Sequence, residues 1–243
     1  MLGGTTEASL LARALAAARS DAVFSYAGRT AEPVAQPLPQ RIGGFGGIAG
    51  LITYLRDQNI THVIDATHPF AAQMSHHAAT ACQILALPLA ALERPAWQPQ
   101  QGDMWNAVQT IEDAVEYLPS APANIFLAIG RQHLHLFSAA PQHHYLMRLV
   151  DTASGPLLPQ STAVIGRGPF QFADDLTLLQ DHNIDIVVTK NSGGTGADAK
   201  LTAARTLGLS VIMVNRPALP DRPSFATVAE VMHWLAHPAD LGV

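Results

Sequence analysis

Two glycines followed by two threonines near the start of the chain have the composition of an anion-binding turn. Gly3, Gly4, Thr5 and Thr6 directly precede an amphipathic stretch of helical length. Free backbone N–H groups and the helix dipole favour a phosphate at such a helix N-terminus. The spacing is not G-x-G-x-x-G, so a tight strand-to-helix turn with a threonine cap is the alternative interpretation.

Arg29 and Thr30 follow the next apolar run of the sequence. Folds that bind dinucleotides contact the adenosine ribose at this position. An acidic residue there would select NAD, whereas an arginine beside a hydroxyl suits the 2′-phosphate of NADP. We therefore assign both residues to an NADPH site, with a solvent-exposed arginine as the alternative.

A second glycine-rich segment, GGFGG, contains Gly43, Gly44, Phe45 and Gly46. So many glycines in one short segment carry a high entropic cost on folding, which a plain loop rarely needs. Close approach of the backbone to a ligand is the natural use, and we assign these four residues to the cofactor site as well.

Asp65, Thr67 and His68 come at the end of a short apolar run, where a strand should give way to a helix. In open α/β folds the carboxyl ends of parallel strands bind ligands. We expect Asp65 and Thr67 to contact the cofactor, and His68 to orient its amide or to act as the catalytic proton donor. A polar residue that caps the next helix is an equally weighted alternative for His68.

The only two lysines of the protein, Lys190 and Lys200, flank a third glycine-rich segment. Compact ammonium groups around such a loop predict an anionic ligand, and chance surface placement is the alternative. Arginines near predicted strand ends could add to a carboxylate-binding face. The residues expected to bind the substrate are Lys190, Asn191, Ser192, Gly193, Lys200, Arg131 and Arg148.

Composition excludes several other classes of function. The net charge of −5 disfavours nucleic acid as a partner. Eleven histidines lack the spacing of a metal site, so no metal is expected. No serine-hydrolase elbow or Walker loop occurs. No apolar run reaches the length of a membrane span, no export signal precedes the glycine turn, and Cys82 is the single cysteine, so we expect a cytoplasmic protein.

Hydrophobic periodicity predicts alternating strands and helices, hence an α/β fold with mostly parallel sheets and helices on both faces. Only two residues precede the first glycine turn, so either the chain starts late or a strand from elsewhere completes the first sheet. The short segment PSAPA at 119–123 predicts two domains, 1–120 and 121–243. Helices are expected at 7–18, 48–57, 71–85, 111–118, 173–181, 197–207 and 228–236, and strands at 22–26, 62–66, 88–92, 125–129, 145–150, 184–189 and 210–215.

Taken together, these motifs resemble the precorrin-6A reductase family of cobalamin biosynthesis. The resemblance extends over most of the chain and rests on the strings GGTTEA, AGRT, GGFGG, DATHPFA, LERPAW, IGRQ, RGPF, VVTKNSGG and AKLTAARTLGLSVIMVNRP. It implies two Rossmann-like halves, with the cofactor and the substrate in the cleft between them, and NADPH-dependent reduction of a double bond of the precorrin macrocycle. It also makes an exchange of strands between the halves possible.

Two alternatives concern the function. If the anaerobic route operates, the substrate would be cobalt-precorrin-6A. A non-catalytic NADP(H)-binding sensor could use the same fold, because a fold and a cofactor site do not establish chemistry. We expect a tetrapyrrole as the small-molecule partner, no nucleic-acid or membrane partner, and a monomer or weak homo-oligomer.

Overall fold

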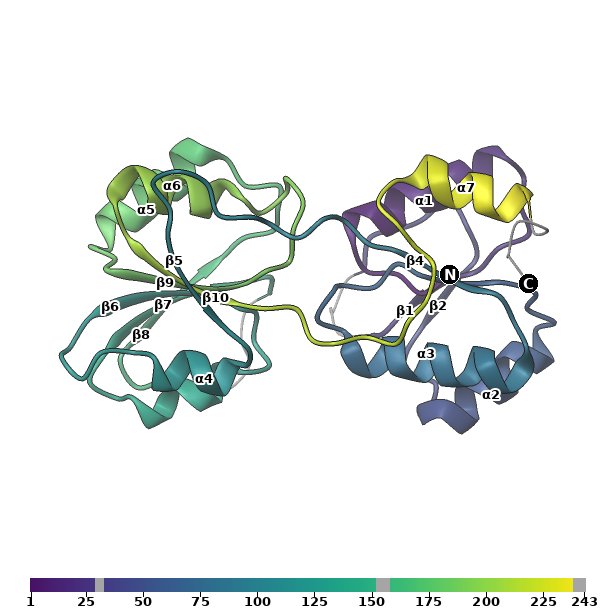
Figure 1. The fold of residues 1–243 in the computed structure, drawn as a ribbon, viewed down its shortest axis with the longest axis horizontal. Helices are drawn as coiled ribbons and strands as arrows, with labels where there is room; N and C mark the ends of the chain where they lie inside the picture. Colours follow the sequence, from purple (N-terminus) through teal and green to yellow (C-terminus); the bar gives the residue numbers. More distant parts are fainter. Residues whose placement is uncertain (29–32, 152–157, 238–243) are drawn as a thin grey trace. The chain divides into compact units, whose positions relative to one another are not determined.

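The computed structural model describes residues 1–28, 33–151 and 158–237, and the chain divides into two compact units (Figure 1). Unit 1 consists of Met1–Pro95 and Pro217–Val243, and unit 2 of Ala96–Arg216. A single boundary near residue 120 does not describe this division, because the chain leaves unit 1 once and returns to it. No helix in the described part of the chain is long and apolar enough to cross a membrane.

Unit 1 contains a parallel sheet in which the first three residues lie at the centre. Leu2 forms parallel bridges with both Ser25 and Asp65, and so joins the strands on either side. The resulting order is β2, β1, Leu2, β3, β4, β11, which is the order 3-2-1-4-5-6 of dinucleotide-binding folds. The strands are β1 (Phe24–Tyr26), β2 (Gln40–Ile42), β3 (Val63–Asp65), β4 (Leu89–Leu92) and β11 (Ser224–Phe225).

Three residues are enough for the central position because their backbone is paired on both sides. The Leu2 N–H donates to the Ile64 carbonyl at 2.8 Å, and the Gly3 N–H donates to the Ser25 carbonyl at 3.0 Å. The Leu2 carbonyl in turn accepts from the Ala66 N–H at 2.9 Å. The glycine turn therefore starts at the carboxyl edge of the sheet.

Helices cover both faces of this sheet (Figure 1). On one face, Leu11, Phe24 and Trp234 belong to one buried core, and on the other Leu51 and Cys82 belong to a second. The first core packs under α1 (Thr6–Ala17) and α7 (Val228–Ala236), and the second under α2 (Gly47–Asp57) and α3 (Ala72–Leu85).

Unit 2 contains a six-stranded, fully parallel sheet in the order β5-β10-β9-β6-β7-β8. Its strands are β5 (Met104–Val108), β6 (Asn124–Ala128), β7 (His144–Leu149), β8 (Ser161–Ile165), β9 (Ile186–Lys190) and β10 (Ser210–Val214). Its helices are α4 (Ile111–Glu116), the 3-10 helix η1 (Leu134–Ala139), α5 (Phe172–Asp181) and α6 (Ala199–Leu207). The core between α5, α6 and the sheet contains Phe126, Leu179 and Val187, all buried.

At one edge of each sheet lies a strand that is out of sequence order with the other strands of that sheet. In unit 1 that position belongs to β11, which follows all of unit 2 in sequence, and in unit 2 it belongs to β5, which precedes the other strands. This is the exchange of strands that the family resemblance makes possible.

All seven predicted helices and all seven predicted strands are present, with ends that agree within two residues. The strands β2, β5, β8 and β11 and the 3-10 helix η1 were not predicted. All four of these strands lie at a sheet edge and have exposed residues, and β11 has only two residues, so their periodicity is weak.

Candidate functional site

The switch point of the unit 1 sheet brings two of the predicted motifs together. From Leu2 the chain continues to β1 and β2 on one side, while β3 and β4 lie on the other. At this divergence the Thr5 hydroxyl donates to the Ala66 carbonyl at 3.0 Å and accepts from the Ala8 N–H at 3.1 Å. Thr5 therefore caps α1 and ties the glycine turn to the segment that follows β3. Ligands of doubly wound sheets bind at this position.

The second glycine segment forms an open floor beside the same turn. A β-carbon placed on Gly43 or Gly44 would meet no atom within 4 Å, and Gly43 has φ +122°. The structure therefore leaves room for close approach of a ligand to this backbone. A small cavity of about 50 Å³ is lined by Leu2, Gly3, Ser25, Ala27, Gly43, Gly44, Phe45, Thr67 and Met74. It unites five of the residues that the sequence assigned to the cofactor.

Arg41, which the sequence analysis did not single out, organises this glycine segment. Its Nη1 donates to the Gly43 carbonyl at 2.5 Å and its Nη2 to the Gly44 carbonyl at 2.6 Å. The guanidinium carbon also lies 3.7 Å from the centroid of the Phe45 ring. The only signal in the sequence is that an arginine stands two residues before the glycines.

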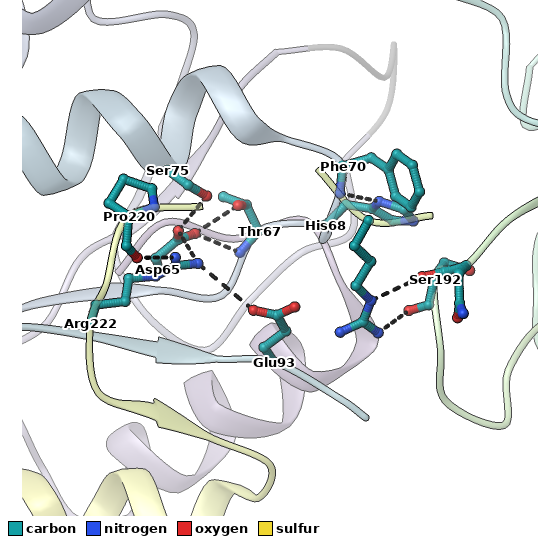
Figure 2. Close-up of polar contacts among 11 residues, drawn as sticks. Asp65, Thr67, His68, Phe70, Ser75, Glu93, Ser192, Pro220 and Arg222 are labelled. Atoms are coloured by element: carbon teal, nitrogen blue, oxygen red, sulfur yellow. Dashed lines mark hydrogen bonds and ion pairs between the residues drawn. The ribbon is translucent and has the colours of Figure 1, made fainter. Parts of the chain in front are cut away.

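Asp65 is engaged within the protein rather than directed toward a ligand (Figure 2). One carboxylate oxygen accepts from the Thr67 hydroxyl at 2.6 Å and from the Thr67 N–H at 3.2 Å. The other accepts from the Ser75 hydroxyl at 2.6 Å and from Arg222 at 3.3 Å. Arg222 also lies 3.8 Å from Glu93. Asp65 thus links β3, α3 and the returning C-terminal segment, and it sets the start of the loop that carries Thr67 and His68.

His68 is half-buried, and its position restricts its proton chemistry. The Phe70 N–H donates to Nδ1 of His68 at 3.2 Å (Figure 2). This bond assigns the proton of the neutral ring to Nε2, because Nδ1 acts as the acceptor. The imidazolium form would carry a proton on Nδ1 and would lose the bond to Phe70. The geometry therefore favours hydrogen-bond donation from Nε2.

Burial suppresses the reactivity of the one thiol of unit 1. Cys82 lies on α3 within the core, and only 2% of its surface is exposed. Desolvation, together with the negative charge of Asp65, raises the pKa of the Cys82 thiol to about 11. A neutral, enclosed thiol is not a nucleophile, in agreement with a structural role.

Unit 2 has a switch point of its own, between the neighbouring strands β6 and β9. Ala128 pairs with Thr189 in parallel register, so the segments after both strands leave the same edge of the sheet. Arg131 is exposed in the segment after β6, and Lys190 is the last residue of β9. The structure thus brings two predicted substrate-binding residues to one edge, at the position where ligands of such sheets bind.

Trp97, which was not predicted to be functional, holds the loop after β9. The Trp97 N–H donates to Asn191 Oδ1 at 2.8 Å, and Asn191 Nδ2 donates to the Trp97 carbonyl at 3.0 Å. The indole N–H donates to the Gly194 carbonyl at 2.7 Å. Arg216 adds bonds to the carbonyls of Asn191, at 3.0 Å, and Ser192, at 3.3 Å. The buried residues Asn191 and Ser192 therefore shape a fixed loop, which turns at Gly193 with φ +69°.

Two predicted substrate ligands lie inside unit 2. Lys200 is 3% exposed, donates to the Ala197 carbonyl, and places its Nζ 4.6 Å from the centroid of the Trp97 ring. Arg148 forms a buried ion pair with Asp175. Both cations support neighbouring loops and helices, so an effect of either on a ligand would act through the segments they hold.

Two predicted cofactor residues, Arg29 and Thr30, lie outside the described residues. Within the described ranges, no three or more histidine, cysteine, aspartate and glutamate side chains are grouped as metal ligands. Gly4, with φ +134°, and Thr6, the first residue of α1, occupy the turn where they were predicted.

Fold and site together define a class: a doubly wound α/β protein whose first sheet carries a nucleotide-type glycine turn at its switch point. The family model of the precorrin-6x reductase CbiJ/CobK matches residues 1–236. A precorrin-6A reductase of Rhodobacter capsulatus is 60% identical over 237 residues, covering 97% of this chain and 94% of that protein. One of Sinorhizobium sp. is 48% identical over 239 residues, covering 98% and 92%.

The solved structure of a CobK precorrin-6A reductase superposes with a TM-score of 0.94 at 60% identity, covering 98% of this chain and 95% of the other. The chain belongs to the precorrin-6x reductase CbiJ/CobK family. It is accordingly an oxidoreductase of cobalamin biosynthesis that needs a nicotinamide cofactor.

Proposed function

We propose that this protein reduces precorrin-6A to precorrin-6B with NADPH as the hydride donor. The observation that carries the proposal is the union of the glycine turn, the glycine floor and Thr67 around one cavity at the switch point of unit 1. The names of the relatives at 60% and 48% identity support the same substrate.

The residues of unit 1 fit a dinucleotide. The first N–H groups of α1 have no acceptor within the helix and point along its positive end, which suits the pyrophosphate. Gly3, Gly4, Thr5 and Thr6 would hold that group, because they form the turn and its cap. The floor of Gly43 and Gly44 accepts a flat group at van der Waals distance, since no side chain stands on it. When bound, the reduced nicotinamide supplies the hydride.

Unit 2 would bind the substrate through its carboxylates. Lys190 and Arg131 stand at the switch-point edge of the second sheet, where they supply charge-assisted donors. Trp97 and Lys200 fix the loop that begins at Asn191, so its donors are held before the substrate arrives. A site prepared in this way lowers the ordering cost of binding.

Within this proposal, His68 takes the role of a hydrogen-bond donor more readily than that of an acid. The bond from the Phe70 N–H to Nδ1 holds the neutral ring, with its proton on Nε2, in the loop after β3. Proton donation would require the imidazolium form and the loss of that bond. Most of the rate enhancement would then come from positioning of the two reactants.

The test is NADPH consumption with freshly prepared precorrin-6A, followed by absorbance, with cobalt-precorrin-6A and NADH in parallel reactions. NADPH-specific turnover of precorrin-6A is the expected result. Turnover of only the cobalt-bearing substrate would assign the anaerobic reaction. NADPH binding by fluorescence without turnover of either substrate would contradict the proposed reaction and favour a sensor.

The variant Lys190→Gln tests the substrate half of the proposal separately. It removes one charge at the unit 2 edge and should raise the KM for precorrin-6A roughly tenfold or more, because hydrogen bonds between charged groups contribute roughly 1.5–3 kcal/mol. The affinity for NADPH should stay the same. Lys200→Gln would instead loosen the loop and reduce the stability of unit 2, because Lys200 is buried.

A further inference from the structure

Arg41 is held at the cofactor end of unit 1 by three hydrogen bonds. Besides the carbonyls of Gly43 and Gly44, its guanidinium contacts the Ser25 hydroxyl at 3.3 Å. The ring of Phe45 lies against it at 3.7 Å, and the ring centroid of Tyr54 is 5.2 Å away. The guanidinium is thereby fixed in a single place, next to residues that line the cavity.

These contacts leave part of the guanidinium unused. An arginine has five N–H donors. Two from Nη1 and one from Nη2 make these three bonds, so Nε–H and a second Nη2–H remain. No described residue supplies a carboxylate within ion-pair distance of Arg41. The described part of unit 1 thus holds a fixed cation with two spare donors and no local counter-charge.

The place of Arg41 in the sheet indicates which anion would bind. Arg41 lies on β2 and reaches Ser25 on β1. The strand β1 is the second strand of the 3-2-1-4-5-6 order, and the end of that strand is where dinucleotide folds contact the adenosine ribose. The pyrophosphate belongs instead at the first turn, beside Thr5. An anion at Arg41 is therefore a phosphate on the ribose.

We propose that Arg41 binds the 2′-phosphate of NADPH and is the residue that selects NADPH over NADH. A phosphate dianion would meet the two spare donors and would neutralise the charge, whereas the 2′-hydroxyl of NADH offers only a weak acceptor. This inference rests on the proposed NADPH dependence. Its test measures cofactor binding without precorrin. The proposal for Arg41 can therefore fail while the proposed reductase activity is confirmed, and the proposed activity can fail while the proposal for Arg41 is confirmed.

The experiment compares Arg41→Gln, Arg41→Lys and the control Arg56→Gln, which removes the same charge from an exposed position on α2. Affinities for NADPH and NADH are measured by fluorescence, and those for 2′,5′-ADP and ADP by competition. Arg41→Gln should weaken binding of NADPH and 2′,5′-ADP roughly 10- to 100-fold, and binding of NADH and ADP less than about threefold. Arg56→Gln should change none of the four affinities.

Arg41→Lys keeps the charge without the planar fork, so it guards against an Arg41→Gln protein that does not fold. It should lower both cofactor affinities through a looser glycine segment, and the ratio of NADPH to NADH affinity should fall less than in Arg41→Gln, because the charge remains while the two-donor contact is lost. Equal losses for both cofactors in Arg41→Gln would overturn the proposal and leave Arg41 as a support of the loop. So would a preference for NADPH that survives in Arg41→Gln and is lost only in Arg29→Gln.

Discussion

Replacement of Arg222 by methionine should destabilise unit 1 by about 3 kcal/mol, because it removes one partner from a buried ion pair. The side chains of Arg222 and Asp65 are 8% and 2% exposed and lie 3.3 Å apart. Breaking such a pair costs roughly 3–5 kcal/mol, since the remaining charge stays buried. The lower end applies because Asp65 keeps three donors, two from Thr67 and one from Ser75.

The single cysteine of the chain offers an assay that reports on unit 1. Cys82 is buried in α3, and its pKa, raised to about 11, leaves almost no thiolate at pH 8. A thiol reagent therefore labels the protein only after unit 1 opens, when the pKa returns to its ordinary value. A loss of 3 kcal/mol should accelerate labelling roughly 150-fold, if opening is faster than the reaction.

Two further variants make the Arg222 experiment decisive. Arg13→Met removes an exposed arginine from α1 and should leave the labelling rate unchanged. The double variant Asp65→Asn/Arg222→Met should recover about 2 kcal/mol relative to the sum of the single changes, because the buried charge of Asp65 is removed together with that of Arg222. Acceleration of less than about fivefold in Arg222→Met, or strict additivity in the double variant, would refute the reasoning that Asp65 depends on Arg222.

Three other predictions follow from single contacts. Thr5→Ala removes the cap of α1, so it should lower the free energy of unfolding by about 1 kcal/mol in thermal unfolding and also weaken NADPH binding. Thr227→Ala removes the cap of α7 and should cost a similar amount, but leave the affinity for NADPH unchanged. Equal effects of the two variants on NADPH affinity would contradict a special role for Thr5. Burial lowers the pKa of His143 below 6.5 in the folded protein, so the unfolded chain takes up the proton first. Unfolding free energy should fall by at most about 1.4 kcal/mol per unit as pH drops below about 6.5, and His143→Asn should flatten this slope in urea titrations. His68→Gln should lower turnover without shifting the pH profile, and a lost acidic limb would restore His68 as the acid.

Local sequence patterns were sufficient to predict most helices and strands, because the buried residues of these elements recur with the period of a helix or a strand. The helices α1 and α2 and the strands β3 and β9 were predicted from runs of apolar residues with clear periods. Edge strands carry no such signal: β2 has exposed residues at both ends, and β11 has only two residues. The membership of β11 and α7 in unit 1 depends on contacts between residues more than a hundred positions apart, which no window of sequence contains.

The residues of the predicted site likewise divide into those that the local sequence reveals and those that it does not. Glycine-rich turns at strand ends are visible because glycine is required where backbone comes close to a ligand, and Gly3, Gly43 and Gly44 do line one cavity. The roles of the charged residues were less accessible. By residue type Lys200 and Arg148 were predicted to be ligands, but both are buried inside unit 2. Arg41 and Arg222 belong to no motif: Arg41 bonds carbonyls two and three residues further along the chain, and Arg222 pairs with the distant Asp65.

The sequence by itself determined the α/β class, the order of most strands and helices, the glycine segments of the site and the resemblance to one reductase family. These properties depend on residue type and on spacing within one or two elements. Only the tertiary structure decided that Leu2 completes the first sheet, that the C-terminal segment returns to unit 1, and that Lys200 and Arg148 lie inside unit 2. Those outcomes depend on which distant segments pack together, because the burial and pairing of a side chain are set by neighbours from other parts of the chain.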